Sequence, residues 1–495
     1  MKTYDERAKD ILQKRDEKMK ENEVKRRKTT RILVVIAAVV LTVAVAVGVV
    51  AASIKGNTPP QVTPDTTSNT DVKQTTPADT GYNDGVIGER PASENPGDYR
   101  GGLAYEKSDG LIKSGTAYAA EASPSASPGI DEDYYSESYH ESETNAATKA
   151  GTLTAGEWKD AAALNDWKEL LNKAEWSDTA KQRNINAKDV ITVKVTDGEA
   201  PCYNVSVKLL SGEKTLFTAK TDIEGKANLF YNVISKDEQP DAVQIGEEKI
   251  SLDGKTEIEA SAAGAGIKVT ALDLMLMIDT TGSMGDELEY IKTELKDVVE
   301  RVAKAGENIS IRVSVNFYRD EGDDYVVKYY DFREDINECV SQLSEQYANG
   351  GGDYPEAVHT ALENAVTGHN WRENAVKLCF FVMDAPPHSE QEIQGINGEM
   401  IKSIKAAAEQ GIRIIPVASS GVDVDTEFVM RSFSVMTGGT YIFITNHSGI
   451  GGDHKEAEVG EHTVEYLNEC MIRVTCEYCG IYTGEKIPYT PTYHQ

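Results

Sequence analysis

The chain has 495 residues and a formal net charge of −30. This length exceeds one ordinary domain, so we expect about three structural units. A surface this acidic repels phosphate backbones, which argues against nucleic-acid binding and suits the binding of cations.

The amino-terminal region combines a charged segment with a long apolar run. Residues 1–31 carry 12 Lys and Arg against 7 Asp and Glu, whereas residues 32–54 carry no charge at all. As a helix, this run spans roughly 35 Å at ~1.5 Å per residue, enough for a bilayer core. Basic residues precede it, so the positive-inside rule predicts a cytoplasmic segment 1–31 and a signal anchor at 32–54. The protein would be a single-pass protein of the cell membrane with an extracellular ectodomain. A cleaved signal peptide is the alternative, and the long core disfavours it.

Two segments of different composition come after the apolar run. Residues 55–150 are rich in Thr, Ser, Pro, Gly, Asp and Glu and lack apolar periodicity, which predicts a disordered linker. Residues 151–188 space large apolar side chains as a short amphipathic helical segment does, and we expect this segment to pack on the next one along the chain. The side chains concerned are Trp158, Leu164, Trp167, Leu170, Leu171 and Trp176.

Residues 189–262 change to the alternation typical of strands. Apolar residues recur at every second position in 191–195 and again in 205–209. Several short strands within about seventy residues predict a small antiparallel β-sandwich. With the turn at Thr221–Ala227, the segment resembles the carboxypeptidase-regulatory-like and immunoglobulin-like sandwiches. That resemblance implies a spacer or contact module.

From residue 268 to 475, strands and helices alternate, which predicts an α/β fold with a mostly parallel sheet and helices on both faces. Residues 476–495 are then a C-terminal tail. The expected strands are 272–278, 309–318, 325–332, 376–383, 412–418 and 441–445. The expected helices are 284–302, 336–347, one starting at Pro355, 400–410, 426–436 and 464–474.

Polar side chains come directly after two of the buried strands. The apolar run Leu272–Ile278 ends in Asp279, with Thr281 and Ser283 two and four residues later, and Asp384 comes after the run 376–383. Ligand sites of open α/β sheets lie beyond the carboxyl ends of strands. Carboxylates and hydroxyls are the hard oxygen ligands that Mg²⁺, Mn²⁺ and Ca²⁺ prefer. We therefore predict a divalent-cation site here, with plain turn and helix capping as the alternative role.

Residues 268–475 resemble a von Willebrand factor type A domain, on the motifs 279–284, 350–356 and 384–388. The resemblance implies a Rossmann-like fold and a metal-ion-dependent adhesion site, whose DxSxS turn appears here as DxTxS. That site binds Mg²⁺, Mn²⁺ or Ca²⁺ and leaves one coordination position for an acidic residue of a protein partner. The family often takes a further ligand, a threonine, from an intervening loop. Here that loop is Gly350–Glu356 and the expected ligand is Asp353, with helix capping as its alternative role.

We therefore predict a membrane-anchored extracellular binding protein and not an enzyme. The chain has no HExxH, GxSxG or P-loop motif, and the extra threonine in Asp279–Ser283 breaks the pattern of aspartic proteases. A surface scaffold with a purely structural, fully protein-ligated metal is the alternative, and a hydrolase is a third. His388 is expected to be an ordinary loop histidine rather than a metal ligand. Cys476 and Cys479 form either a local disulfide or two free thiols.

Overall fold

The computed structural model describes residues 83–88, 148–234, 236–262, 269–305, 309–352 and 354–481. The predicted cytoplasmic segment 1–31, the predicted anchor 32–54, most of the predicted linker and Asp353 lie outside these ranges. Within them, no helix combines the length and apolar character needed to cross a membrane. The described residues belong to one compact unit that begins at Thr80.

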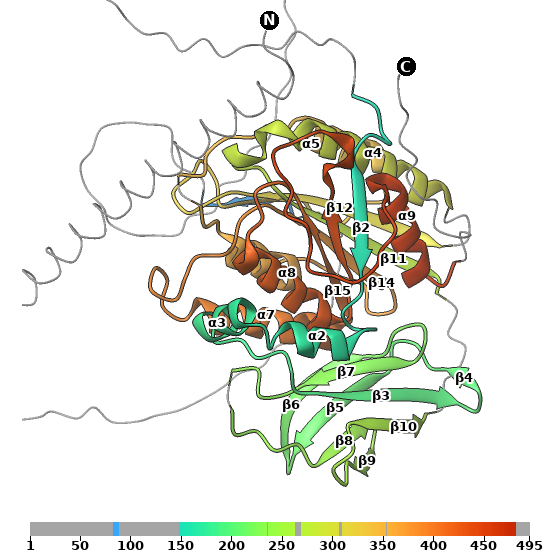
Figure 1. The fold of residues 1–495 in the computed structure, drawn as a ribbon. Helices are drawn as coiled ribbons and strands as arrows, with labels where there is room; N and C mark the ends of the chain where they lie inside the picture. Colours follow the sequence, from blue (N-terminus) through green and yellow to red (C-terminus); the bar gives the residue numbers. More distant parts are fainter. Residues whose placement is uncertain are drawn as a thin grey trace, which may run out of the picture. The chain divides into compact units, whose positions relative to one another are not determined.

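A nine-stranded sheet forms the centre of this unit, in the order β1-β13-β12-β11-β14-β15-β16-β2-β17. Its five middle strands run parallel to one another, which confirms the predicted α/β fold with a mostly parallel sheet (Figure 1). They are β12 (Ser310–Tyr318), β11 (Ala271–Asp279), β14 (Val376–Met383), β15 (Ile412–Ala418) and β16 (Tyr441–Ile444). The outer strands pair antiparallel: β1 (Gly85–Ile87), β13 (Val327–Tyr329), β2 (Thr154–Trp158) and β17 (Glu465–Tyr466).

Helices cover both faces of the sheet, because successive side chains of a buried strand point to opposite sides. Met275 and Met277 face one apolar core, and Leu274 and Leu276 face the other. The first core is closed by α6 (Val358–Thr367), α7 (Ile396–Gln410) and α8 (Val424–Thr437). The second is closed by α4 (Leu288–Ala305), α5 (Ile336–Ser344) and α9 (Leu467–Tyr478). The helix expected to start at Pro355 begins at Val358 instead, since Glu356 pairs with the loop after β14.

The segment before the predicted sandwich is part of the α/β unit. Its strand β2 lies between β16 and β17, and the helices α2 (Leu164–Leu170) and α3 (Ala174–Gln182) come next. The carboxylate of Glu294 on α4 accepts the backbone N–H groups of Gly151, Thr152 and Leu153 at 2.8, 2.7 and 2.9 Å. The α/β unit therefore starts more than a hundred residues before residue 268, and the β-rich segment is inserted into it.

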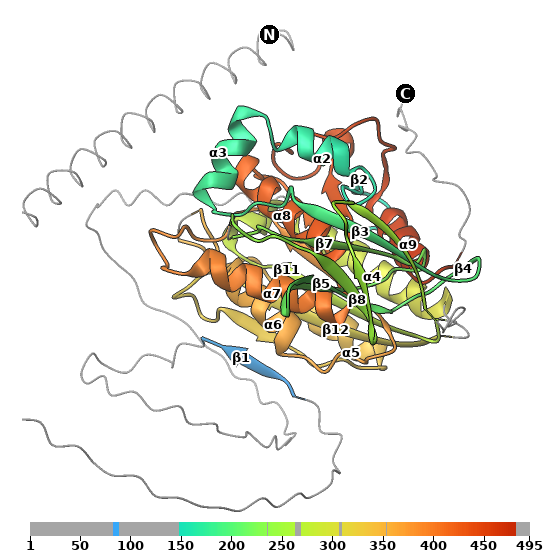
Figure 2. The same cartoon turned by 90° about the horizontal axis from the view of Figure 1, so that it is seen from below.

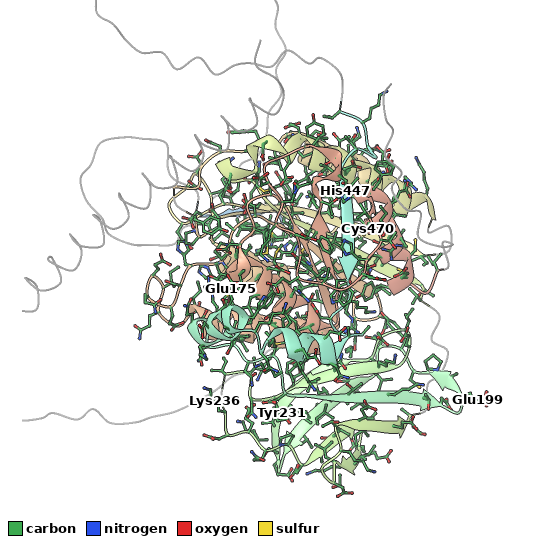
Figure 3. The ribbon with its side chains drawn as sticks, viewed as in Figure 1. Glu175, Glu199, Tyr231, Lys236, His447 and Cys470 are labelled. Carbon is green, nitrogen blue, oxygen red and sulfur yellow. The ribbon has the colours of Figure 1, made fainter. Side chains whose placement is uncertain are left out.

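The inserted segment consists of two four-stranded sheets. One contains β3 (Val190–Asp197), β4 (Ala200–Pro201), β7 (Lys226–Phe230) and β10 (Glu257–Ser261). The other contains β5 (Ser206–Ser211), β6 (Lys214–Lys220), β8 (Ala242–Ile245) and β9 (Glu248–Ser251). The prediction of a purely antiparallel sandwich is wrong at one pair, because β10 returns to the free edge of β3 and runs parallel to it. Glu199 marks the outer tip of this segment, between β3 and β4 (Figure 3).

The two β-rich sheets contact the edge of the central sheet at which its parallel strands begin. Tyr203 donates to the carbonyl of Ala375, just before β14, at 3.5 Å. Arg413, near the start of β15, donates to the carbonyl of Lys220 at 2.9 Å. The opposite edge of the sheet, where the predicted cation site lies, is left clear by these contacts.

Strand β1 lies within residues predicted to be a disordered linker. It pairs with β13 at the edge of the sheet, and the neighbouring Asp84 forms an ion pair with Arg333. A three-residue strand carries no periodic signal, which explains why the composition of the segment gave no sign of it.

Candidate metal centre

The turn after β11 is organised by Asp279, whose side chain is fully buried. Its Oδ1 accepts the backbone N–H of Thr281 at 2.8 Å and the Thr281 hydroxyl at 2.6 Å. That hydroxyl lies 3.1 Å from the hydroxyl of Ser283. Thr281 is buried and Ser283 is exposed, so the three predicted ligands run from the interior of the domain to its surface.

The fourth predicted ligand, Asp384, comes to the same place because β11 and β14 are neighbouring parallel strands. It is 3% exposed. Burial, together with the negative charge of Asp279, raises the pKa of Asp384 well above its usual value, although a hydrogen bond from Ser283 lowers it in part. Burial also raises the pKa of Asp279 to about 6, against its hydrogen bonds from Thr281. The structure thus brings all four predicted ligands of the turn and of β14 together.

The glycine-rich loop is tied directly to this turn. Gly282 donates to the carbonyl of Gly350 at 3.0 Å, and Asn349 donates to the carbonyl of Thr280 at 3.0 Å. Gly351 has φ +69°, and a Cβ there would lie 2.9 Å from Oε1 of Glu356 and 3.1 Å from Cβ of Thr281. A glycine is required at this position by both conformation and space. Asp353, the ligand predicted in this loop, lies outside the described residues.

Glu356 is the site residue that the sequence analysis did not single out. It is 2% exposed, its N–H donates to the carbonyl of Pro386 at 3.0 Å, and it forms an isolated parallel bridge with Pro387. Burial, followed by the charges of Asp279, Asp320 and Asp384, raises its pKa to about 10. Its place in the motif 350–356 was the available signal, but only its burial in the structure shows that the carboxylate turns inward.

Three buried carboxylates of this site lack a hydrogen-bond partner for one oxygen each. These atoms are Oδ2 of Asp279, Oδ1 of Asp384 and Oε2 of Glu356. Buried carboxylates are stable as anions only when a cation or hydrogen bonds compensate them. Taken with the two hydroxyls, the donor set therefore fits a hard divalent cation.

Carboxylates alone do not complete a metal site here. In the described part of the chain, no three His, Cys, Asp or Glu side chains are grouped so that they could hold a metal ion. An ion at this place would need the hydroxyls of Thr281 and Ser283, as the DxTxS pattern implies, and water.

Two histidines near the site are already paired with acids. Nε2 of His388 lies 2.7 Å from Oδ1 of Asp320, in agreement with its expected role as a loop residue. Nε2 of His454 lies 3.1 Å from Oε2 of Glu287, whose other oxygen accepts the N–H of Ser420 at 2.6 Å. These pairs connect loops around the site, and Nε2 of each histidine contacts an acid other than its three inward-facing carboxylates.

All six cysteines are buried, and none of them forms a disulfide. Of the two alternatives for Cys476 and Cys479, the structure therefore has the free thiols. Burial raises the pKa of both. Cys470 and Cys476 lie in α9 on the α/β unit (Figure 3 labels Cys470), and Cys479 comes directly after this helix. Because buried thiols with raised pKa values are poor nucleophiles, neither Cys476 nor Cys479 suggests covalent chemistry.

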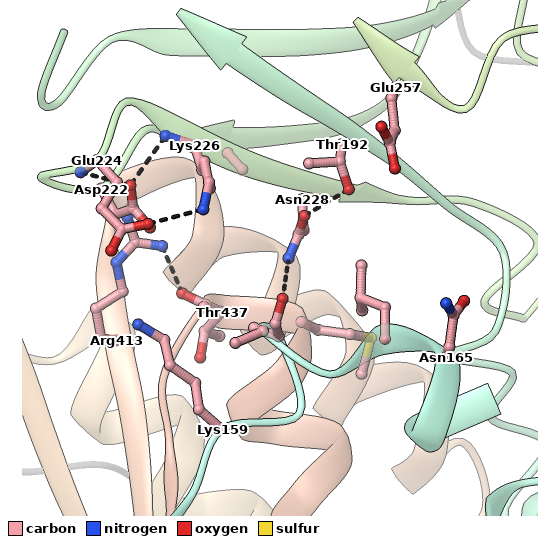
Figure 4. A pocket seen from close by; sticks show the side chains of 16 residues that line it. Lys159, Asn165, Thr192, Asp222, Glu224, Lys226, Asn228, Glu257, Arg413 and Thr437 are labelled. Carbon is pink, nitrogen blue, oxygen red and sulfur yellow. Dashed lines mark hydrogen bonds and ion pairs between the residues drawn. The ribbon is translucent and has the colours of Figure 1, made fainter. Parts of the chain in front are cut away.

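A cavity of about 480 Å³ lies away from this centre, where the inserted sheets meet the α/β unit (Figure 4). Lys226 pairs with Glu224 at 2.8 Å, Asn228 accepts from Thr192 at 2.9 Å, and Arg413 donates to the carbonyl of Thr437 at 2.7 Å. Positive and negative side chains line it in equal number, so its charge selects no class of ligand.

Comparison with known proteins agrees with the geometry. Residues 273–449 match the von Willebrand factor type A domain family. An ariadne-like RING finger protein of Acanthamoeba polyphaga mimivirus is 25% identical over 186 residues, which cover 35% of this chain and 18% of that protein. An alpha-protein kinase of Dictyostelium discoideum is 25% identical over 181 residues, covering 35% of this chain and 29% of the kinase. The chain thus spans less than a third of the length of these curated relatives.

Among solved structures, an aerotolerance-related membrane protein from Bacteroides fragilis NCTC 9343 is 13% identical. The match covers 42% of this chain and 89% of that one, with a TM-score of 0.22. The sequence match and the sheet topology together establish the family of this region: residues 273–449 form a von Willebrand factor type A domain, a type of domain that generally mediates protein–protein interaction or adhesion.

Proposed function

We propose that this domain binds one divalent cation, Mg²⁺ or its relatives Mn²⁺ and Ca²⁺, and that the cation mediates contact with a protein partner. The main support for this proposal is the set of three buried carboxylate oxygens without hydrogen-bond partners, on Asp279, Asp384 and Glu356. A divalent ion would neutralise much of this charge, held directly by no more than two of the three carboxylates together with the hydroxyls of Thr281 and Ser283 and water. Asp353 remains a further proposed ligand.

The surface around Ser283 supports a role in binding over a purely structural one. Ser283 is exposed, whereas Asp279, Thr281 and Asp384 are buried, so an ion held among them would face solvent on one side only. On that side a coordination position is open to water or to an acidic residue of a partner. A scaffold site would instead be closed by protein ligands on every side.

The proposed setting is the cell surface. The apolar run 32–54 would anchor the chain in the bilayer and leave the domain outside the cell on a linker. We propose no catalytic step. Among the described residues, the acids that adjoin the centre share hydrogen bonds with backbone groups and histidines, and the centre itself offers carboxylates and hydroxyls suited to holding an ion.

The test is a calorimetric titration of the full-length chain, in mild detergent, with Mn²⁺ and with Mg²⁺. We expect binding by the parent and its loss in Asp384→Asn, which keeps the side-chain volume and removes the charge. The apo form of that variant should be more stable than the parent at neutral pH, because a buried uncompensated carboxylate has been removed.

Asp297→Asn is the matched control. Asp297 is a partly buried carboxylate on α4 that pairs with Arg301 and Asn468, away from the site. It should leave cation binding unchanged. Equal binding heats in the parent and in Asp384→Asn would refute the cation site. Cation binding without any protein partner whose binding a chelator abolishes would favour the scaffold alternative.

A further inference from the structure

The loop that carries Asp384 is held by a residue from a distant part of the chain. Asp384 is followed by Ala385, Pro386 and Pro387, and the two prolines have no backbone N–H with which to anchor the loop. Two successive carbonyls of this loop, those of Pro387 and His388, accept hydrogen bonds from the guanidinium of Arg183, at 2.8 and 2.6 Å.

The same guanidinium is fixed from a second side. Its Nε and Nη2 donate to the two carboxylate oxygens of Asp425, at 2.8 and 2.5 Å, in the first turn of α8. The Arg183 side chain is 6% exposed. Four directed bonds therefore connect the end of α3, the start of α8 and the loop after β14. Only the planar fork of an arginine can make them together.

The anchored loop carries one acidic residue of the proposed site, Asp384, and pairs with the backbone of another, Glu356. Asp384 lies three residues before the first carbonyl that Arg183 holds. Glu356 donates its N–H to Pro386 and bridges with Pro387. Pro387 is therefore held in place by Arg183 on one side and by Glu356 on the other.

Arg183 lies ninety residues before the matched region 273–449 and comes directly after α3. Helix α3 lies beside α8 (Figures 1 and 2), and Trp176 on α3 packs edge-on against Phe428 on α8, with ring centroids 6.2 Å apart. The inserted β-rich sheets begin only seven residues after Arg183, at Val190. The segment before the insertion thus connects the inserted sheets to the loop of the proposed site.

We propose that Arg183 is a positioning residue of the cation site, which holds the loop of Asp384 and Glu356 in the geometry that binds the ion. This inference rests on the proposed function. It also assigns part of the functional unit to residues 148–187, outside the family-matching region. Removing the fork would leave the carbonyls of Pro387 and His388 without their donor and let the loop relax away from the ion.

The experiment measures Mn²⁺ affinity by calorimetry in full-length Arg183→Met and Arg183→Lys, at a temperature well below the unfolding of each variant. Loss of a group that orients metal ligands lowers metal affinity about 10- to 100-fold. We expect a loss of that size in Arg183→Met. A smaller loss is expected in Arg183→Lys, because an ammonium group can reach one carbonyl but cannot form the fork.

Arg473→Met is the control for a merely structural effect. Arg473 is likewise a buried arginine paired with carboxylates, those of Glu157 and Glu465, but it lies on α9, away from the loop of Asp384. It should lower the melting temperature and leave the Mn²⁺ affinity within about twofold of the parent, because its bonds orient no metal ligand. Asp425→Asn, which weakens one side of the fork and keeps the carbonyl contacts, should weaken binding by a few fold.

The outcomes separate the two proposals. A parent chain that does not bind Mn²⁺ refutes the proposed function and this inference with it. A parent that binds while Arg183→Met binds equally well refutes the role of Arg183 alone. If Arg183→Met does not fold, Arg183→Lys and Asp425→Asn decide the question, and unchanged affinity in both overturns the inference.

Discussion

Arg431 provides the sharpest test of the finding that residues 148–187 belong to the α/β unit. It lies on α8 and is 1% exposed. Its Nε and Nη2 donate to the two oxygens of Asp160, at 2.9 and 2.7 Å, and Nη1 donates to Glu427 at 3.1 Å. The guanidinium also lies over the rings of Trp167 and Trp176, 5.5 and 5.2 Å from their centroids. Three of these four partners come from the segment before the inserted sheets.

The substitution Arg431→Met would keep most of the volume and remove the charge. Asp160 would then be a fully buried carboxylate without its cation. Burial already raises its pKa even with Arg431 present. Glu427 would keep Lys455, at 2.5 Å. Breaking a buried ion pair by removing one partner destabilises a protein by about 3–5 kcal/mol, and we expect a loss in that range.

The assay is a guanidinium titration at pH 7 followed by tryptophan fluorescence, since two of the four tryptophans of the chain flank Arg431. Adding Asp160→Asn to the variant should recover more than about 1 kcal/mol, because the two residues interact directly. Arg301→Met is the matched control. Its pairs with Asp297 and Glu469 are 27–40% exposed and should contribute under about 1 kcal/mol. A loss below about 1 kcal/mol in Arg431→Met would refute the reasoning.

Three further outcomes are expected. Burial lowers the pKa of His369 to about 4, so the folded protein should lose about 3 kcal/mol as the pH falls from about 6.5 to 4. Acid titrations of His369→Phe should lack that loss, and an identical acid profile would contradict the burial argument. Gly351→Ala should lower both stability, by about 1–2 kcal/mol, and Mn²⁺ affinity, because of its φ of +69° and its close approach to Glu356. Gly352→Ala, where a Cβ meets nothing within 4 Å, should change neither. Finally, the raised pKa values of the three site carboxylates mean that the folded apo protein holds more protons than the unfolded chain above about pH 4.5. Apo stability should then fall as the pH rises, and cation binding should strengthen and release protons, as calorimetry in two buffers of different ionisation enthalpy would show.

The sequence predicted well those elements whose burial follows from the pattern of apolar and polar residues within the element itself. The strands 376–383 and 412–418 were predicted to the residue, because each is an apolar run between polar ends that lies buried on both faces. Strand β2 was missed for the opposite reason. Its residues 154–158 show no apolar run, and their burial comes from β16 and β17, about three hundred residues away in the chain.

The same division applies to the candidate site. Asp279, Thr281, Ser283 and Asp384 come directly after predicted strands, so their meeting results from the order of two parallel strands. Glu356 is placed by its bridge with Pro387, a contact between two loops that no periodicity encodes. Arg183 was invisible for a similar reason, since its partners are backbone carbonyls about two hundred residues away.

The arrangement of the inserted sheets bears on how a partner could reach the site. They contact Ala375 and Arg413, at the starts of β14 and β15, whereas Asp384 lies just past the end of β14. An eight-residue strand at about 3.3 Å per residue separates these two edges by roughly 25 Å. These two contacts of the insertion therefore lie at the edge opposite to the carboxylates. One connection between the insertion and the edge with the carboxylates is the segment that contains α3 and Arg183, whose anchoring the affinity measurements test.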